Sequence, residues 1–273
     1  MTTAAGGTDF ERFLEDVRAM AAALVETGWA EKNAGNLSVN VSRFFPAVSE
    51  MVARTFIPRP FHEASLAGER FLITGTGVRF RDIAKDPSKG CAILQGAKDR
   101  NGFHVVWGAG AMGWAPTSEF PSHLKVHGLL KAAGGTDNTV LHTHPTALIA
   151  MTHLPNLPKG PAFCERLWGM IPEVKAYLPG GARFVPYAMP GSDALGEATL
   201  KELKSGAEIV VWEMHGALAV APGPWEAFDL LEVADKAASI YLAAKATGEE
   251  PRGLNAAQLK EIEKKFPPPP ARG

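Results

Sequence analysis

The connections between the strand-like segments of this chain are short, and this limits the sheet that the chain can build. The clearest case is the pair of apolar segments at 209–212 and 217–220, which are separated only by a tight turn around His215. Parallel neighbours need a crossover of a dozen or more residues, whereas antiparallel neighbours can be joined by a tight turn. The sequence therefore predicts a largely antiparallel or mixed sheet.

Helical patterns lie between the strand-like segments. Residues 10–24 carry apolar side chains at steps of three and four, which is typical of an amphipathic helix. Ser192 is placed to cap a helix over 193–204, and Pro224 opens a longer helix that ends near Gly248. Because helices and strands are intermixed, we expect the α/β class, with helices on both faces of the sheet.

No internal repeat and no break in composition divides the chain, so we expect a single domain over residues 1–273. Two stretches depart from its regular pattern. Residues 43–69 lack periodicity and predict an irregular insertion, and the prolines of 267–273 predict an extended tail.

The composition gives no sign of a nucleic-acid or membrane partner. The formal net charge is -1, and no end carries a block of one sign. No apolar run approaches the roughly 18–20 residues that span a bilayer, and no secretory signal is visible. The two cysteines, Cys91 and Cys164, lack a CxxC spacing and favour a reducing compartment. We therefore expect a cytoplasmic protein that binds neither nucleic acid nor membrane.

His142 and His144 form the sharpest chemical feature. In a strand, alternate side chains point to the same face, so both imidazoles can reach one metal ion. Neutral imidazole suits Zn²⁺, and a third histidine would leave a coordination position open for a substrate. His215 is the best third candidate, although an HxH pair also occurs by chance and the other histidines are expected at the surface or in hydrogen bonds.

Three polar turns offer places for an anion. The segment 115–119 (APTSE) precedes a helical pattern, so its hydroxyls either cap that helix or contact a phosphate, with Glu119 available for acid/base work. The cap is the favoured reading of the residues alone. Segments 33–36 (NAGN) and 74–77 (TGTG) expose backbone N–H groups that bind anions, but Asn and Gly are also the ordinary residues of turns.

Six blocks of the chain, in order, resemble those of the class II aldolases. They are GWAEKNAGNLSV, FLITGTGVRFRD, APTSEFP, VLHTHPTALIAMT, AMPGSDALGEAT and EMHGALAVAPG. The resemblance runs over about residues 10–266. It implies a three-layer α/β/α fold around a mainly antiparallel sheet, a cyclic homotetramer and a site near a subunit interface.

The resemblance also assigns roles to individual residues. It implies that His142, His144 and His215 bind Zn²⁺, and that Glu119 and Glu173 exchange protons with the substrate. The residues that match the family's phosphate-binding positions are Asn33, Gly35, Asn36, Thr76, Gly77, Thr117 and Ser118. Thr76 stands where a serine is usual, and it keeps the hydroxyl.

The implied reaction is the reversible cleavage of a sugar phosphate. Within the family the likeness is strongest to members that act on L-rhamnulose 1-phosphate, which would yield dihydroxyacetone phosphate and L-lactaldehyde. The long segment after Leu37 and the match at Glu173 favour this substrate. The alternatives are a fuculose-phosphate aldolase, a pentulose-phosphate 4-epimerase or a methylthioribulose-phosphate dehydratase. A non-catalytic interaction domain is disfavoured because all three histidines are present.

Overall fold

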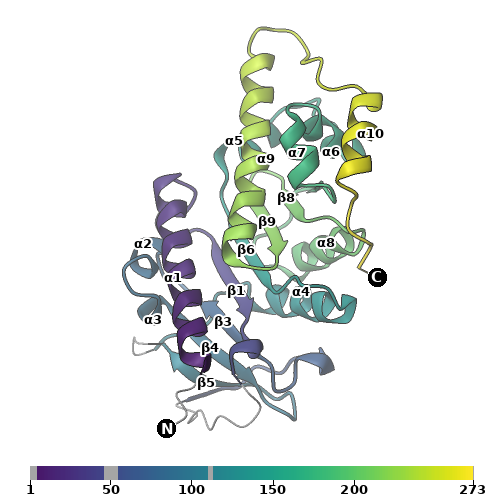
Figure 1. Ribbon diagram of the computed structural model, residues 1–273. Helices are drawn as coiled ribbons and strands as arrows, with labels where there is room; N and C mark the ends of the chain where they lie inside the picture. Colours follow the sequence, from purple (N-terminus) through teal and green to yellow (C-terminus); the bar gives the residue numbers. More distant parts are fainter. Residues whose placement is uncertain (1–4, 46–54, 110–112, 273) are drawn as a thin grey trace. The chain divides into compact units, whose positions relative to one another are not determined.

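The computed structural model describes residues 5–45, 55–109 and 113–272 (Figure 1). By its internal contacts the chain divides into two compact units. Unit 1 comprises Met1–Leu141 and Ala221–Trp225, and unit 2 comprises His142–Val220 and Glu226–Gly273. Each is described by itself, and the single domain expected over 1–273 stays a prediction.

The described part of unit 1 is built on strands in the order β2-β5-β4-β3-β1, and all of these neighbours pair antiparallel. The strands are β1 (Asn36–Asn40), β2 (Thr55–Ile57), β3 (Arg70–Thr74), β4 (Cys91–Gly96) and β5 (Phe103–Gly108). The connection between β4 and β5, residues 97–102, is too short for a parallel crossover, whereas the other neighbouring pairs are joined through longer stretches of chain. The expectation from the sequence is confirmed here.

Helix α4 (Phe120–Ala133) packs on the apolar core of unit 1. Its Phe120 meets Phe103 of β5 with ring centroids 5.0 Å apart, and Leu124 joins the same buried cluster. Gly134 ends α4 in the left-handed conformation, with φ of 67°. The other helices of unit 1 are α1 (Ala5–Glu26), α2 (Phe80–Ile83), α3 (Pro87–Gly90) and the 3-10 turns η1 (Ser42–Phe44) and η2 (Ala64–Leu66).

The stretch 43–69, expected to be irregular, contains short elements in its described part. These are the end of η1, strand β2 and η2, and the rest of the described stretch has no regular structure. Residues 46–54 lie outside the described residues. The idea of an insertion stays a prediction.

Strand β6 (Thr139–Thr143) carries the chain from unit 1 into unit 2. Unit 2 continues with β7 (Ala182–Val185), β8 (Ile209–Trp212) and β9 (Gly216–Ala221). The β8–β9 hairpin is antiparallel, as predicted, whereas β7 and β8 pair in parallel across helix α8 (Asp193–Lys204). The fold is therefore of the α/β class with mainly antiparallel pairing, and the prediction of this class is confirmed.

The helix starts of unit 2 follow the capping rules. Ser192 caps α8 by accepting a hydrogen bond from Leu195 N at 3.2 Å, and Asn255 and Gln258 form a reciprocal capping box. The remaining helices are α5 (Thr146–Thr152), α6 (Pro161–Trp168), α7 (Pro172–Tyr177), α9 (Pro224–Lys245) and α10 (Ala256–Lys265). No helix of the described residues is both long and apolar enough to cross a membrane.

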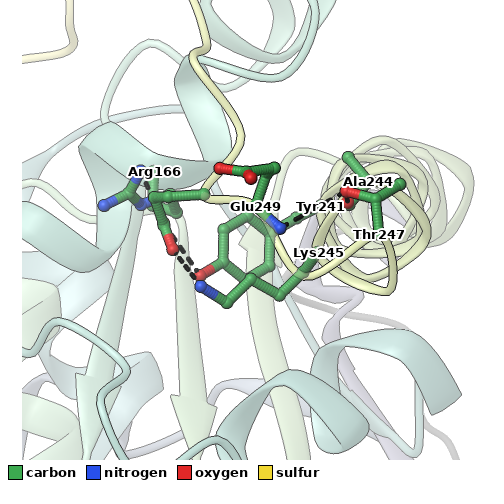
Figure 2. A network of polar contacts seen from close by, with 7 residues as sticks. Arg166, Tyr241, Ala244, Lys245, Thr247 and Glu249 are labelled. Atoms are coloured by element: carbon green, nitrogen blue, oxygen red, sulfur yellow. Dashed lines mark hydrogen bonds and ion pairs between the residues drawn. The ribbon is translucent and has the colours of Figure 1, made fainter.

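Charged contacts fasten the C-terminal part of unit 2. The Glu250 carboxylate pairs with Arg166 at 3.0 Å and with Lys245, and it accepts a hydrogen bond from the Tyr241 hydroxyl at 3.2 Å (Figure 2). Farther along, Glu263 of α10 pairs at 2.9 Å with Lys175, whose side chain is buried in α7. These contacts hold α10, which has no buried side chain of its own, against α7.

Candidate functional site

The three predicted metal ligands lie together in unit 2. His142 lies in β6, His144 directly follows the last residue of β6, and His215 lies in the turn between β8 and β9. Their potential ligand atoms all lie within 4.8 Å of one another, and the three ring centroids are 5.0–5.6 Å apart. Among the described residues, these three histidines form the group of potential ligand side chains that lie close enough together to hold a metal ion.

The protonation state of His142 suits a metal ligand. Its Nδ1 lies 3.0 Å from the carbonyl oxygen of Ala217, which can only accept a hydrogen bond, so Nδ1 carries the proton. Burial lowers the pKa of His142 well below its ordinary value, and the neighbouring His144 and His215 lower it further. The neutral ring therefore keeps the lone pair of Nε2 for a metal ion.

A strained turn presents His215. Met214, which precedes it, is a non-glycine residue in the left-handed region, with φ of 56°. Its backbone N–H donates to Thr152 Oγ1 at 2.9 Å, which holds the turn against α5. On the inner side, the Trp212 ring stacks on His215 at 5.0 Å and packs on His142 at 4.5 Å.

Gly216 lies where a side chain has no room. A Cβ atom at this position would stand 2.6 Å from the Thr143 carbonyl oxygen and 2.9 Å from carbon atoms of the His142 and His144 rings. The backbone of β9 thus closes directly over two of the imidazoles. Sequence reasoning did not single out Gly216, Trp212 or Thr152, since their roles depend on the meeting of β6 with the β8–β9 turn.

The donor set fits a divalent transition metal. Three neutral imidazoles are a known ligand set for zinc, with metal–nitrogen distances of about 2.0–2.1 Å. The spacing of the ring nitrogens is compatible with one shared ion, and the close approach of Gly216 and the hydrogen bond of His142 fix the rings that would hold it.

In unit 1, two of the predicted phosphate-binding turns lie against each other. Gly75 and Pro116 form a β-bridge, and Thr117 N donates to Thr74 O at 3.0 Å. The Thr76 hydroxyl donates to the Pro116 carbonyl at 2.7 Å. Thr76, Gly77 and Ser118 are exposed beside this joint, and Thr117 is buried.

Glu119 connects this joint to β1. Its Oε2 accepts a hydrogen bond from Asn36 Nδ2 at 2.9 Å, and both side chains are buried. Leu37 N also donates to Thr74 Oγ1 at 3.1 Å. Three segments far apart in sequence therefore converge in unit 1 around one carboxylate.

The hydroxyl caps favoured for α4 are not observed. Glu119 is itself the N-cap residue, without a side-chain cap hydrogen bond, and Thr117 Oγ1 accepts only a long bond of 3.4 Å from Glu119 N. The carboxylate instead binds Asn36, because the buried amide offers it a charge-assisted hydrogen bond.

The other predicted residues lie apart from these contacts. Asn33 and Gly35 belong to the turn that precedes β1, with Asn33 exposed and Gly35 at φ of 78°. Glu173 is exposed in the first turn of α7. The contacts found in the described part of the chain do not link Glu173 to the three histidines.

Known proteins resemble this chain over most of its length. The model of the Class II Aldolase and Adducin N-terminal domain matches residues 15–242. A rhamnulose-1-phosphate aldolase of Bacteroides thetaiotaomicron is 38% identical over 92% of each chain, and one of Listeria monocytogenes is 31% identical over 93% of each. The crystal structure of a sugar-phosphate aldolase from Thermotoga maritima superposes with a TM-score of 0.76 and 28% identity, covering 90% of this chain and 100% of the other.

The fold and the cluster of three histidines define an α/β protein whose histidines could hold a metal ion. With the family match over most of its length, the chain belongs to the class II aldolase and adducin N-terminal family. The alignments with aldolases over more than nine tenths of both chains place it among the enzymes of that family.

Proposed function

We propose that the chain is a zinc-dependent aldehyde-lyase that cleaves L-rhamnulose 1-phosphate reversibly to dihydroxyacetone phosphate and L-lactaldehyde. The observation that carries the proposal is the convergence of His142, His144 and His215 in a chain whose relatives are rhamnulose-1-phosphate aldolases.

His142, His144 and His215 are the proposed ligands of Zn²⁺. A bound zinc ion supplies Lewis-acid stabilisation of the negative charge that develops when the bond between C3 and C4 breaks. Three protein ligands leave room for substrate oxygens at the ion. The neutral state of His142 and the hydrogen bond from its Nδ1 to Ala217 keep the ring oriented with Nε2 available.

Two carboxylates are the proposed proton carriers. Glu119 exchanges the proton at C3, and Glu173 takes the proton of the C4 hydroxyl on the aldehyde side. The hydrogen bond from Asn36 leaves the second oxygen of Glu119 available for a proton. Glu173 is exposed and so is accessible to a substrate or a second subunit.

The phosphate of the substrate is proposed to bind the turns of unit 1. The exposed residues Thr76, Gly77 and Ser118 lie around the Gly75–Pro116 bridge, and tight turns of this kind can offer backbone N–H groups to an anion. The full proposed set is Asn33, Gly35, Asn36, Thr76, Gly77, Thr117 and Ser118. Anchoring the phosphate orients the ketose before reaction, so changes in these residues are expected to raise KM.

The proposal extends to the assembly and the compartment. We propose a homotetramer in the cytoplasm with no nucleic-acid or membrane partner, in line with the family resemblance and the balanced charge. Light scattering on the purified protein measures the mass of the assembly, and a monomer that is fully active would contradict the tetramer.

A substrate panel with matched zinc analysis tests the function. Purified protein is offered L-rhamnulose 1-phosphate, L-fuculose 1-phosphate and a pentulose 5-phosphate. Dihydroxyacetone phosphate release is followed enzymatically for the two 1-phosphates, and inversion at C4 is followed for the pentulose 5-phosphate. Release from rhamnulose 1-phosphate with about one zinc per chain supports the proposal. Release from fuculose 1-phosphate alone rejects the substrate, and protein with neither zinc nor turnover supports a non-catalytic member of the family.

A further inference from the structure

A row of polar side chains joins β1 to α4 in unit 1, buried at Asn36, Ser38, Glu119, His123 and His127 and partly exposed at its other end, and we name it the polar ladder. Asn36 Nδ2 binds Glu119 Oε2 at 2.9 Å, and the Ser38 hydroxyl lies 2.6 Å from His123 Nδ1 and 2.8 Å from His127 Nε2. At its end, Asn40 binds Glu69 at 2.9 Å, and Glu69 pairs with Lys131. The polar ladder therefore comprises Asn36, Ser38, Asn40, Glu69, Glu119, His123, His127 and Lys131.

The spacing of the polar ladder follows the side-chain periods of strand β1 and helix α4. Alternate residues of β1 point to one face, and residues four apart on α4 lie on one side of the helix. Two residues of a strand advance about 6.6 Å and four residues of a helix about 6 Å. Successive side chains of β1 and α4 therefore stay close enough to form several contacts in a row. A shift of α4 along β1 would break the contacts of Asn36 and Ser38 with Glu119, His123 and His127.

The contacts of Ser38 with His123 and His127 are the most deeply buried part of the polar ladder. Ser38 is fully buried, and His123 and His127 are 1% and 3% exposed. One hydroxyl between two imidazoles donates its hydrogen to one ring and accepts an N–H from the other, so the two rings need complementary tautomers. Burial and the nearby His123 lower the pKa of His127 to about 3, which keeps that ring neutral.

Because Ser38 is fully buried, its hydroxyl cannot itself react with a substrate. A serine with no exposed surface cannot be reached by a substrate, so its likeness to a nucleophile with a histidine base has no catalytic use here. The apolar contacts of α4 hold the helix on the sheet, but hydrophobic packing has no direction of its own. Directional hydrogen bonds are what can fix the register.

We propose that the hydrogen bonds of Ser38 with His123 and His127 are a positioning device that sets the register of α4 on β1 and thereby places the carboxylate of Glu119. His123 lies one helical turn after Glu119, and Ser38 lies two residues after Asn36, the partner of that carboxylate. The inference rests on the proposed function, in which Glu119 exchanges a proton with the substrate.

The test is a double-mutant cycle between Ser38→Ala and Glu119→Gln, in the full-length metal-loaded protein with L-rhamnulose 1-phosphate. Ser38→Ala is expected to lower kcat about 10- to 100-fold, the order expected when a catalytic group is misplaced by up to 1 Å. KM and zinc content are expected to stay near those of the wild type. When Glu119 is already Gln, Ser38→Ala is expected to lower kcat no further.

Thr139→Val is the matched control, since Thr139 is also a fully buried strand residue of unit 1, and its hydroxyl donates to the side chain of the neighbouring Asn138 at 3.2 Å, outside the polar ladder. Its kcat is expected to stay within about twofold of the wild type, as for a buried hydroxyl outside the ladder. Ser38→Cys, which keeps the side-chain size, gives the same comparison should Ser38→Ala fail to fold.

The outcomes are distinct. A Ser38 variant with wild-type kcat, or losses that multiply in the double variant, overturns the positioning role. A Glu119→Gln protein with full turnover contradicts the proposed function of Glu119 itself, whatever Ser38 does. Loss of kcat in the Ser38 variant without further loss in the double variant supports the inference.

Discussion

Replacing Gly216 with alanine tests whether the backbone of β9 shapes the proposed metal centre. The added Cβ would lie 2.6 Å from Thr143 O, about 0.8 Å inside the 3.4 Å at which ordinary van der Waals contact begins. It would also press at 2.9 Å on the rings of His142 and His144. None of these neighbours is the far end of a flexible side chain, so β9 or the two imidazole rings must move.

The expected effects on metal binding and on the stability of the fold are of similar size. Overpacking of this kind costs about 1–3 kcal/mol of unfolding free energy. Metal–ligand distances tolerate only about 0.2 Å, so movement of two ligand rings should weaken zinc binding. Loss of a supporting contact typically costs on the order of 10- to 100-fold in metal affinity, which is about 1.4–2.7 kcal/mol.

The affinity is measured by competition with a chromophoric chelator, and the fold by circular dichroism and thermal unfolding. Gly135→Ala is the matched control, because a Cβ there meets nothing within 4 Å. Zinc affinity of Gly216→Ala within twofold of the control would refute the claim that the bare backbone of β9 is needed beside these histidines.

Three further predictions concern the other groups. His144→Ala is expected to lose zinc and turnover while circular dichroism stays close to the wild type, since the half-buried ring ends β6 and lies outside the main core. Glu119→Gln is expected to retain zinc while kcat falls on the order of 10²–10⁴, as steady-state kinetics and metal analysis can show together. For Glu69, burial raises the pKa, but hydrogen bonds from Lys131, Asn40 and Ser42 outweigh it and the pKa is lowered from 4.5. A carboxyl with a lowered pKa stabilises the fold above its unfolded pKa and loses this effect as the pH falls through the folded value. The difference in unfolding free energy between wild type and Glu69→Gln should therefore shrink as urea titrations move from pH 7 to pH 3, and a difference independent of pH would contradict it.

Local rules predicted the parts of the site that local structure determines. The alternation of a strand is enough to put His142 and His144 on one face, and both lie at the end of β6 as expected. The tight turn at His215 predicted the antiparallel hairpin, and the cap at Ser192 predicted the start of α8. Each of these depends on residues within a few positions of one another.

The parts that were missed depend on distant contacts. Strand β4 (Cys91–Gly96) is buried on both faces, so it lacks the alternation by which a strand is recognised, and the sequence did not reveal it. The parallel pair of β7 and β8 was likewise not specified by the pattern. The hydrogen bond between Asn36 and Glu119 spans 83 residues, and the 115–119 segment alone could not decide between a helix cap and this contact.

Met214 and Glu119 both depart from local conformational preference, and Met214 precedes a proposed metal ligand while Glu119 is a proposed proton carrier. Met214 accepts a left-handed backbone that costs a non-glycine residue on the order of 1–3 kcal/mol, and a hydrogen bond to Thr152 holds it there. Glu119 occupies a helix N-cap without capping the helix, because its carboxylate is bound by Asn36. A sequence selected only for stability would have a glycine at position 214 and an ordinary capping residue at position 119. The structure instead uses these residues to present His215 and to hold a buried carboxylate, which is the pattern expected where function competes with local stability.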